Sequence, residues 1–310
     1  MNKAKLHHFN PQFVLRGFAD DTGRITTIRL PERKSRTTRV RETGAENHLY
    51  TIPDHPSGPD VFEKRLGAGI ETDTAEIFTR VESGEWPLQP DARDTLAEFI
   101  ALQVLRGPEQ RRRMETVASV LYRRTAGQLS KARFASWASD ATGRRVGEAE
   151  VDELWGSIMN ADGAPISYTP RDHIEMMGEV TEPIAAILAA RPWTLVRFRQ
   201  RALITCDAPV TPVPYEECDP FMGVGLATAR FVLYPMSSRT GLVMRDPLIG
   251  SGPNDDLDVM TKETRSGARD DELVEKPAIK ELMNERVAEH AVNNIYHHPD
   301  DSLFVPQAFR

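Results

Sequence analysis

The chain has 310 residues, of which 40% are hydrophobic and 27% are charged. This balance is typical of a globular protein and excludes a chain that is disordered throughout. The formal net charge of −7 excludes a generally basic nucleic-acid binder, but it does not exclude a local basic surface. The length suffices for one large domain or two ordinary ones.

No stretch approaches the roughly 20 consecutive apolar residues that a membrane-spanning helix requires. The first residues also lack the apolar segment of a signal peptide, so we expect a cytoplasmic protein that does not insert into a membrane. The two cysteines, Cys206 and Cys218, do not form a CxxC pair, which argues against a zinc site built on thiolates. Their spacing leaves a disulfide open, and reduced thiols are favoured in the cytoplasm.

The first fifty residues are predicted to form loops and short strands. Pro11 blocks a helix through the histidines before it. After a turn signal at residues 20–23, residues 24–30 alternate in the manner of a half-exposed strand. A run of Arg and Lys follows at residues 33–41, and residues 46–52 are predicted to form another short strand.

The middle of the chain is predicted to be helical. Asp60 is placed to cap a helix that begins near Val61. Residues 91–106 hold a helical period that Gly107 and Pro108 interrupt. Further helices are predicted at residues 109–124, 147–159 and 170–190.

The last third returns to strands, which are predicted at residues 193–198, 202–206, 231–234, 240–244 and 302–305. Residues 249–272 are predicted to form a loop and residues 279–295 a final helix. Strands at both ends around a helical centre indicate an α+β fold, with a mostly antiparallel sheet built from N-terminal and C-terminal strands. We expect a single domain, residues 1–310, in which the helical region of about residues 60–190 is an insert.

The most distinctive segment is HHFNPQFVLRGF at residues 7–18. It resembles the opening of the bacterial and fungal family catalogued as domain of unknown function 4238, whose pattern is His-His-x-x-Pro-Gln-x-x-Leu-Arg-x-Phe. Other segments resemble that family in the same order: ENHLY at 46–50, Glu63 and Glu71, LQVLRGP at 102–108, and ITCDAPV at 204–210. Because the family is named for its unknown function, the resemblance implies membership and no reaction.

Adjacent residues in an extended segment point to opposite faces. His7 and His8 therefore should not chelate one metal ion together, and we expect only one of them, His8, to face a site. One interpretation of His8, Gln12 and Arg16 is that they are polar ties that hold an irregular N-terminal arm on the body of the protein. The other is that they line a pocket.

Four further residues also have two interpretations, and for the two glutamates the second is that they are solvated charges on a helix. Glu63 and Glu71 lie about 80° apart on a helical wheel and ~12 Å apart along the axis of an ideal helix, so each is expected to meet a different partner. Arg106 could bind a phosphate or carboxylate ligand, or pair with one of these glutamates. Asp207 follows a short apolar strand, where an acid serves as a metal ligand or general base, or as a turn cap.

The leading hypothesis is a metal-assisted hydrolase that acts on phosphodiesters, similar to a nuclease. Mg²⁺ or Mn²⁺ is the expected ion, with Zn²⁺ less favoured. Nucleic acid would bind through local basic patches. The run Arg111–Arg113 is one candidate patch, although a solvated helix face is the favoured interpretation of it. The assigned residues are His8, Glu63 and Asp207 for catalysis, Gln12, Arg16 and Arg106 for substrate, and His7, His8, Glu71 and Asp207 for the metal.

The alternative is a non-catalytic binding or interaction module in which the same polar residues form a buried network. The two hypotheses differ in one geometric requirement. Catalysis requires these side chains to converge on an accessible cleft, whereas a structural network is buried and fully paired.

Overall fold

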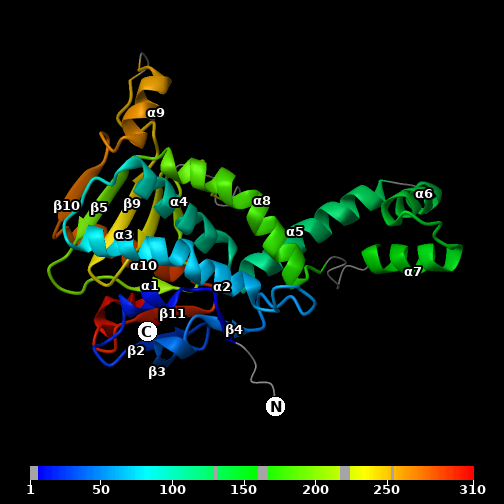
Figure 1. Ribbon diagram of the computed structural model, residues 1–310, viewed down its shortest axis with the longest axis horizontal. Coiled ribbons are helices and arrows are strands. Elements are labelled where there is room, and N and C mark those ends of the chain that lie inside the picture. The colour runs from blue at the N-terminus through cyan, green and yellow to red at the C-terminus, as the bar shows by residue number, and fades with distance from the viewer. Residues whose placement is uncertain (1–5, 129–130, 160–166, 217–223, 253–254) are drawn as a thin grey trace. The chain divides into compact units, whose positions relative to one another are not determined.

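The computed structural model describes residues 6–128, 131–159, 167–216, 224–252 and 255–310 (Figure 1). The chain divides into two compact units, one made of residues 1–107 and 174–310 and the other of residues 108–173. The first unit thus joins both ends of the chain. The single domain with an insert at about residues 60–190 stays a prediction; the unit that separates is the shorter segment 108–173.

The largest sheet of the first unit has five strands in the order β10-β5-β9-β8-β7. β10 runs parallel to β5, and the other neighbouring pairs are antiparallel. The strands predicted at residues 231–234 and 240–244 are confirmed as β8 and β9, which pair as an antiparallel hairpin. The strands are β5 (Trp193–Arg197), β7 (Thr211–Val213), β8 (Phe231–Pro235), β9 (Thr240–Arg245) and β10 (Asp271–Val274).

A second sheet joins strands from the two ends of the chain, in the order β3-β2-β11-β6, and all its pairs are antiparallel. A third, two-stranded sheet pairs β1 with β4. The predicted α+β class is therefore confirmed, with several small sheets instead of one. The strands are β1 (Leu6–His8), β2 (Arg24–Arg29), β3 (Lys34–Arg39), β4 (Ala45–Asn47), β6 (Thr205–Cys206) and β11 (Asn294–His297).

The helices α3 and α4 cover one face of the five-stranded sheet (Figure 1). Their apolar faces form the main core with β5, β8 and β9. A Cβ atom at Gly241 of β9 would lie 2.6 Å from the end of the Met283 side chain, so a larger residue here would have to displace that side chain. The helices of this unit are α1 (Gln12–Arg16), α2 (Val61–Ala68), α3 (Ile70–Glu82), α4 (Pro90–Leu105), α8 (Pro170–Ala189, from Ile174 on), α9 (Leu257–Arg265) and α10 (Pro277–His290).

Near the C-terminus two predicted elements are wrong, and a predicted helix is confirmed but ends earlier than expected. The predicted loop 249–272 contains α9, because the Asp256 side chain accepts hydrogen bonds from two main-chain N–H groups of the first turn. The predicted helix 279–295 ends at His290, since the residues that follow pair as β11 with β2 and β6. The predicted strand 302–305 is a 3₁₀ turn, η2 (Ser302–Phe304). Two other 3₁₀ turns are η1 (Val40–Glu42) and η3 (Gln307–Phe309).

The second unit is helical, with α5 (Pro108–Gly127), α6 (Lys131–Thr142) and α7 (Glu148–Met159). Its small core is centred on Phe134 and Val151, and the Trp155 ring packs against Phe134. The helix α6 has no counterpart among the predicted elements, although Phe134 and Ala138 have the i, i+4 spacing of a buried helical face.

Within the described residues, no helix has the length and apolar content needed to cross a membrane. Cys206 is a buried free thiol, and burial raises the pKa of that thiol. Cys218 lies outside the described residues.

Candidate functional site

The strand β1 turns its two histidines in opposite directions, as the alternation of a strand predicts. His7 is 1% exposed. Its Nδ1 accepts the Tyr50 N–H at 2.9 Å, and its Nε2 lies 3.4 Å from a carboxylate oxygen of Asp60. His7 therefore ties β1 to the segment before α2, while His8 lies on the wall of a pocket.

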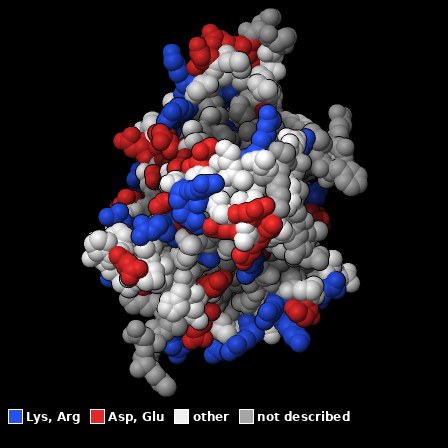
Figure 2. Space-filling view, turned by 90° about the vertical axis from the view of Figure 1, so that its right-hand side faces the viewer, with Lys and Arg blue, Asp and Glu red and all other residues white. Residues whose placement is uncertain are grey.

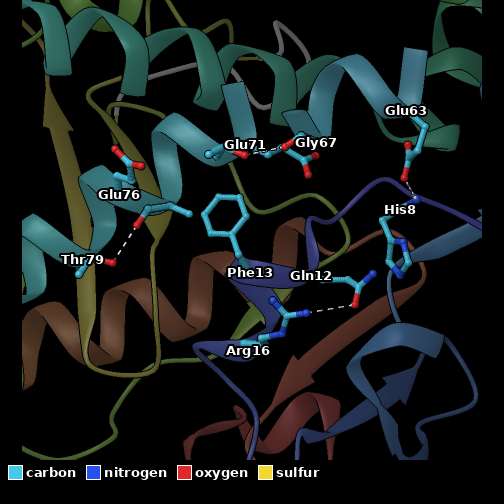
Figure 3. A pocket seen from close by; sticks show the side chains of 11 residues that line it. His8, Gln12, Phe13, Arg16, Glu63, Gly67, Glu71, Glu76 and Thr79 are labelled. Atoms are coloured by element: carbon cyan, nitrogen blue, oxygen red, sulfur yellow. Dashed lines mark hydrogen bonds between the residues drawn. The ribbon is translucent and has the colours of Figure 1, made fainter. Parts of the chain in front are cut away.

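This pocket has a volume of about 460 Å³ and is lined by β1, α1, α2 and α3 (Figure 3). Gln12 and Arg16 lie one turn apart on α1, and an Arg16 N–H is 3.5 Å from the Gln12 Oε1. The lining residues are His8, Gln12, Phe13, Arg16, Glu63, Gly67, Glu71, Thr72, Ala75, Glu76 and Thr79. Five of the eight predicted site residues thus share one cavity.

A break between α2 and α3 brings both predicted glutamates to the pocket. The single helix expected from Val61 stops at Ala68, because Gly69 has φ −114° and ψ −109°, outside the helical region. A new helix begins at the next residue. Glu63 and Glu71 therefore belong to different helices. The helical-wheel angle calculated for one ideal helix does not apply to them, and both can line the same pocket.

The His8 ring has a defined tautomer. Its Nε2 lies 3.3 Å from the Arg41 carbonyl oxygen, which can only accept, so Nε2 carries the proton and Nδ1 the lone pair. Burial lowers the pKa of His8, the Arg41 carbonyl opposes this change, and the charge of Arg106 lowers the pKa further. Because the ordinary value is already 6.5, the imidazole is neutral at pH 7.

One carboxylate oxygen of Glu63 has no hydrogen-bond partner among the described residues. The Glu63 Oε1 accepts the main-chain N–H of His8 at 3.1 Å. The oxygen without a partner is Oε2, which is buried. Burial raises the pKa of Glu63, against the opposing effects of the His8 N–H and the Arg106 charge.

Both terminal nitrogens of Arg106 are bonded to protein groups, and Arg106 does not line the pocket. Its guanidinium is 1% exposed, donates to a Glu71 carboxylate oxygen at 2.7 Å, and donates to the His8 carbonyl. The Tyr50 hydroxyl donates to the Arg106 carbonyl. Of the two interpretations of Arg106 that the sequence allows, the structure therefore has the pair with a glutamate.

Asp207 lies outside the pocket lining, after β6. Its Oδ1 accepts the N–H of Val292 at 2.9 Å, and its Oδ2 accepts the N–H groups of Asn293 and Asn294 at 2.8 and 3.0 Å. These bonds hold the turn that leads from α10 into β11. Of the interpretations of Asp207 that the sequence allows, this arrangement is the turn cap.

Asp207→Asn should lower the free energy of unfolding by about 1–3 kcal/mol, because an amide cannot accept on both sides and leaves N–H groups without partners. Urea denaturation measures this change. Asp54→Asn is the control, since Asp54 is an exposed loop residue. Equal stability of the two variants would show that the cap contributes nothing.

Among the described residues, no three His, Cys, Asp or Glu side chains are placed to share one metal ion. His7 and Asp207, both expected as ligands, do not line the pocket, and Glu71 is paired with Arg106. A cation in this pocket would therefore depend on the other lining carboxylates, Glu63 and Glu76, together with water and ligand oxygens.

A family model described as "Protein of unknown function (DUF4238)" matches residues 6–301. The chain belongs to the DUF4238 family. No curated protein and no solved structure matches it. The match confirms the resemblance that residues 7–18 carry, and it assigns no reaction to the DUF4238 chain.

The opening motif of this DUF4238 chain divides into a structural and a pocket-facing set. Leu15 and Phe18 are fully buried in the main core, and the Asn10 amide donates to the Cys206 carbonyl at 3.2 Å. The pocket-facing set is His8, Gln12, Phe13 and Arg16. Glu76 and Thr79 also line the pocket, and the sequence does not single them out because their i, i+3 spacing is common on any exposed helical face.

Proposed function

We propose that the pocket at His8 hydrolyses phosphodiester bonds with the help of a divalent cation. The observation that carries this proposal is the combination on one cavity wall of a neutral imidazole, an unpartnered carboxylate oxygen and an exposed guanidinium. General bases with a pKa near or below neutrality, together with a cation and an arginine, are the groups that phosphodiester hydrolysis uses.

His8 would act as the general base. The Arg41 carbonyl holds the proton on Nε2, which leaves Nδ1 to accept a proton from a water molecule. The resulting hydroxide would form a bond to phosphorus as the bond to the leaving oxygen breaks. The leaving oxygen would take up the proton that His8 accepted, directly or through water, which yields a monoester and an alcohol and restores the neutral imidazole. The lowered pKa of His8 keeps the base unprotonated at neutral pH.

Arg16 would bind the substrate phosphate. Its side chain is exposed on the pocket and donates to the neutral Gln12 amide, and Arg16 forms no ion pair with any described residue. A guanidinium without a counter-charge is suited to bidentate binding of phosphate oxygens. Gln12 would orient that guanidinium through the same contact.

Glu63 is the residue that would hold the cation. Mg²⁺ typically keeps several water ligands and is bound by one or two carboxylates together with substrate phosphates, a mode that a single free carboxylate oxygen satisfies. When bound, the cation would neutralise charge on the phosphoryl oxygens. Because burial raises the pKa of Glu63, protons should compete with the cation below that pKa.

Glu63→Gln should abolish activation by Mg²⁺ while leaving the fold intact, because the amide keeps the shape of the side chain. The measurement is hydrolysis of bis(p-nitrophenyl) phosphate by protein stripped with a chelator and then titrated with Mg²⁺ or Mn²⁺. Glu76→Gln is the matched control, since Glu76 lines the same pocket. An unchanged metal response in Glu63→Gln would remove Glu63 from the proposal.

A second candidate is a binding module without catalysis. It is favoured by the engagement of Arg106 and Asp207 with main-chain groups, which is what a structural network requires. This candidate predicts that a phosphodiester raises the melting temperature of the protein and is recovered intact. Turnover by the wild-type protein would exclude it.

A further inference from the structure

The hairpin of β2 and β3 concentrates positive charge. Residues 24–41 contain seven Lys or Arg residues and a single acidic one, Glu32, which gives this segment a formal charge of +6. The whole chain carries −7. The composition of the chain therefore does not account for this local charge.

The register of the hairpin places three of these cations on the same face. Arg29 lies directly opposite Lys34, and Arg36 lies opposite Thr27, two positions along. Arg29, Lys34 and Arg36 are all exposed, and none forms an ion pair in the part of the chain that the structure describes. Since like charges opposite each other in a sheet are destabilising, the protein holds these cations together at a cost in stability.

The strand β3 also offers uncharged donors. It is an edge strand, because β2 is its neighbour on one side and the sheet order ends with it on the other, so main-chain N–H groups face outward. Figure 2 shows Lys and Arg side chains gathered along the lower margin of one face, at the level where Figure 1 places β2 and β3.

We propose that this hairpin binds the phosphate backbone of a nucleic acid. Arg and Lys, hydroxyl side chains and main-chain N–H groups are the donors that proteins use toward backbone phosphates. Residues 24–41 contain no aromatic side chain on which bases could stack. Binding is therefore independent of base sequence and strongly dependent on salt.

A nucleic acid fits this surface better than an anionic membrane does. Proteins that bind in the plane of a membrane bury apolar side chains beside their cations. The exposed residues at positions 31–36 are Pro, Glu, Arg, Lys and Ser, which offer no large aliphatic or aromatic group for insertion.

The hairpin leads directly to the pocket. β3 ends at Arg39, and in the turn η1 that follows, the Arg41 carbonyl accepts the hydrogen bond from the His8 ring. A polynucleotide along β3 would thus bring its phosphodiesters toward His8. The assignment of a polynucleotide as the substrate rests on the proposed function, whereas backbone binding by the hairpin does not.

The test measures binding of a short fluorescein-labelled DNA duplex to the full chain by fluorescence anisotropy over a range of NaCl concentrations. The test variant is Arg29→Gln/Lys34→Gln/Arg36→Gln, which relieves repulsion between neighbouring cations and should fold. The control variant, Arg144→Gln/Arg265→Gln/Arg286→Gln, removes the same charge from exposed arginines that each pair with a carboxylate.

The test variant should bind at least tenfold more weakly. The slope of log K against log salt is negative, and its magnitude should fall by about 3 in the test variant. This is about one unit for each phosphate that the variant no longer neutralises. The control variant should bind like the wild type. Equal losses in both variants, no binding by the wild type, or tighter binding to phosphatidylserine vesicles than to DNA would overturn the inference.

The variant His8→Gln separates this inference from the proposed function. It should bind the duplex as tightly as the wild type, because it leaves the hairpin unchanged. If the wild type binds DNA through the hairpin but hydrolyses no phosphodiester, the proposed function fails and the inference stands. If it hydrolyses bis(p-nitrophenyl) phosphate but binds no DNA, the inference fails alone.

Discussion

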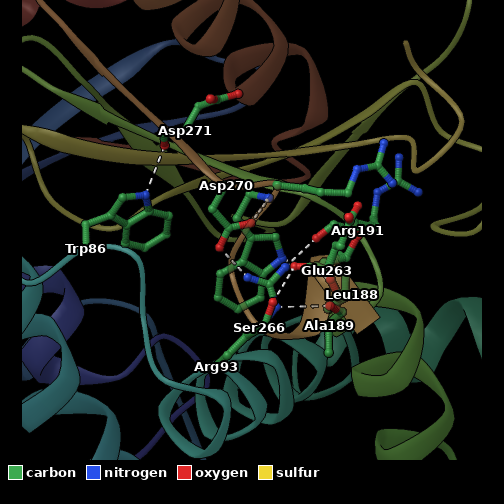
Figure 4. Close-up of polar contacts among 12 residues, drawn as sticks. Trp86, Arg93, Leu188, Ala189, Arg191, Glu263, Ser266, Asp270 and Asp271 are labelled. Carbon is green, nitrogen blue, oxygen red and sulfur yellow. Dashed lines mark hydrogen bonds and ion pairs between the residues drawn. The ribbon is translucent and has the colours of Figure 1, made fainter. Parts of the chain in front are cut away.

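Asp270→Asn should lower the free energy of unfolding by about 3–5 kcal/mol, because it leaves a buried arginine without its counter-charge. Arg93 on α4 pairs with the Asp270 carboxylate, and both side chains are 0% exposed. The Arg93 guanidinium also donates to the main-chain carbonyls of Ala189 and Arg191 at 3.1 and 2.6 Å (Figure 4). Nothing in the variant could replace the lost negative charge.

The same pair connects elements that are distant in sequence. The second carboxylate oxygen of Asp270 accepts the N–H of Trp193 at 2.8 Å. The Arg93 guanidinium lies over the Trp193 ring, 4.1 Å from its centroid. Through these contacts α4 is fixed to the end of α8 and the start of β5, so loss of the charge should loosen the whole junction.

Urea denaturation of wild type and variant measures the effect. The chain contains a matched control in the residue after Arg93, since Asp94 pairs with Arg265 on the surface, where both side chains are about half exposed. Asp94→Asn should cost no more than about 1 kcal/mol, because exposed ion pairs contribute little. Equal losses in the two variants would contradict the role assigned to the buried pair.

Elements that depend on local signals could be predicted from the sequence. The helix expected at residues 91–106 is found at Pro90–Leu105, since its apolar period and the Gly107-Pro108 stop lie within or beside the element itself. Residues 294–297 cannot be separated from the preceding helical pattern. Their strand exists because β2, far away in the chain, and β6 pair with both of its edges.

In the candidate site, too, features set by local sequence could be predicted, whereas features set by distant partners could not. Strand alternation alone separates His7 from His8, and the structure places only His8 on the pocket. The sequence offers the cap at Asp207 as one of two interpretations and cannot decide for it, because its partners follow 85 to 87 residues later in the chain. Arg93 and Asp270 pair across 177 positions of the chain. No local sequence pattern around either residue predicts this ion pair.

His8→Gln should lower the rate constant for phosphodiester hydrolysis by about 10²- to 10⁴-fold, the usual contribution of a general base. The amide can still donate toward the Arg41 carbonyl, but it cannot take a proton from water. Binding of DNA and stability in urea should stay close to the wild type, which separates loss of chemistry from loss of fold.

The pH dependence gives the same residue a second signature. Because the pKa of His8 is lowered from 6.5, the activity of the wild type should rise with pH through a midpoint below 6.5 and be fully developed at neutrality. The folded state also resists protonation of His8. Stability should therefore rise with pH between the folded-state pKa and 6.5, where the unfolded chain binds more protons. His8→Gln should remove that rise.

The most direct measurement of the central claim is hydrolysis of bis(p-nitrophenyl) phosphate with added Mg²⁺ by wild type, His8→Gln and His48→Gln. His48 is an exposed histidine whose ring contacts the Thr51 hydroxyl and does not line the pocket. The account predicts turnover by wild type and His48→Gln, and its loss in a folded His8→Gln protein. No turnover by the wild type with Mg²⁺ or Mn²⁺, or full activity in His8→Gln, would contradict it.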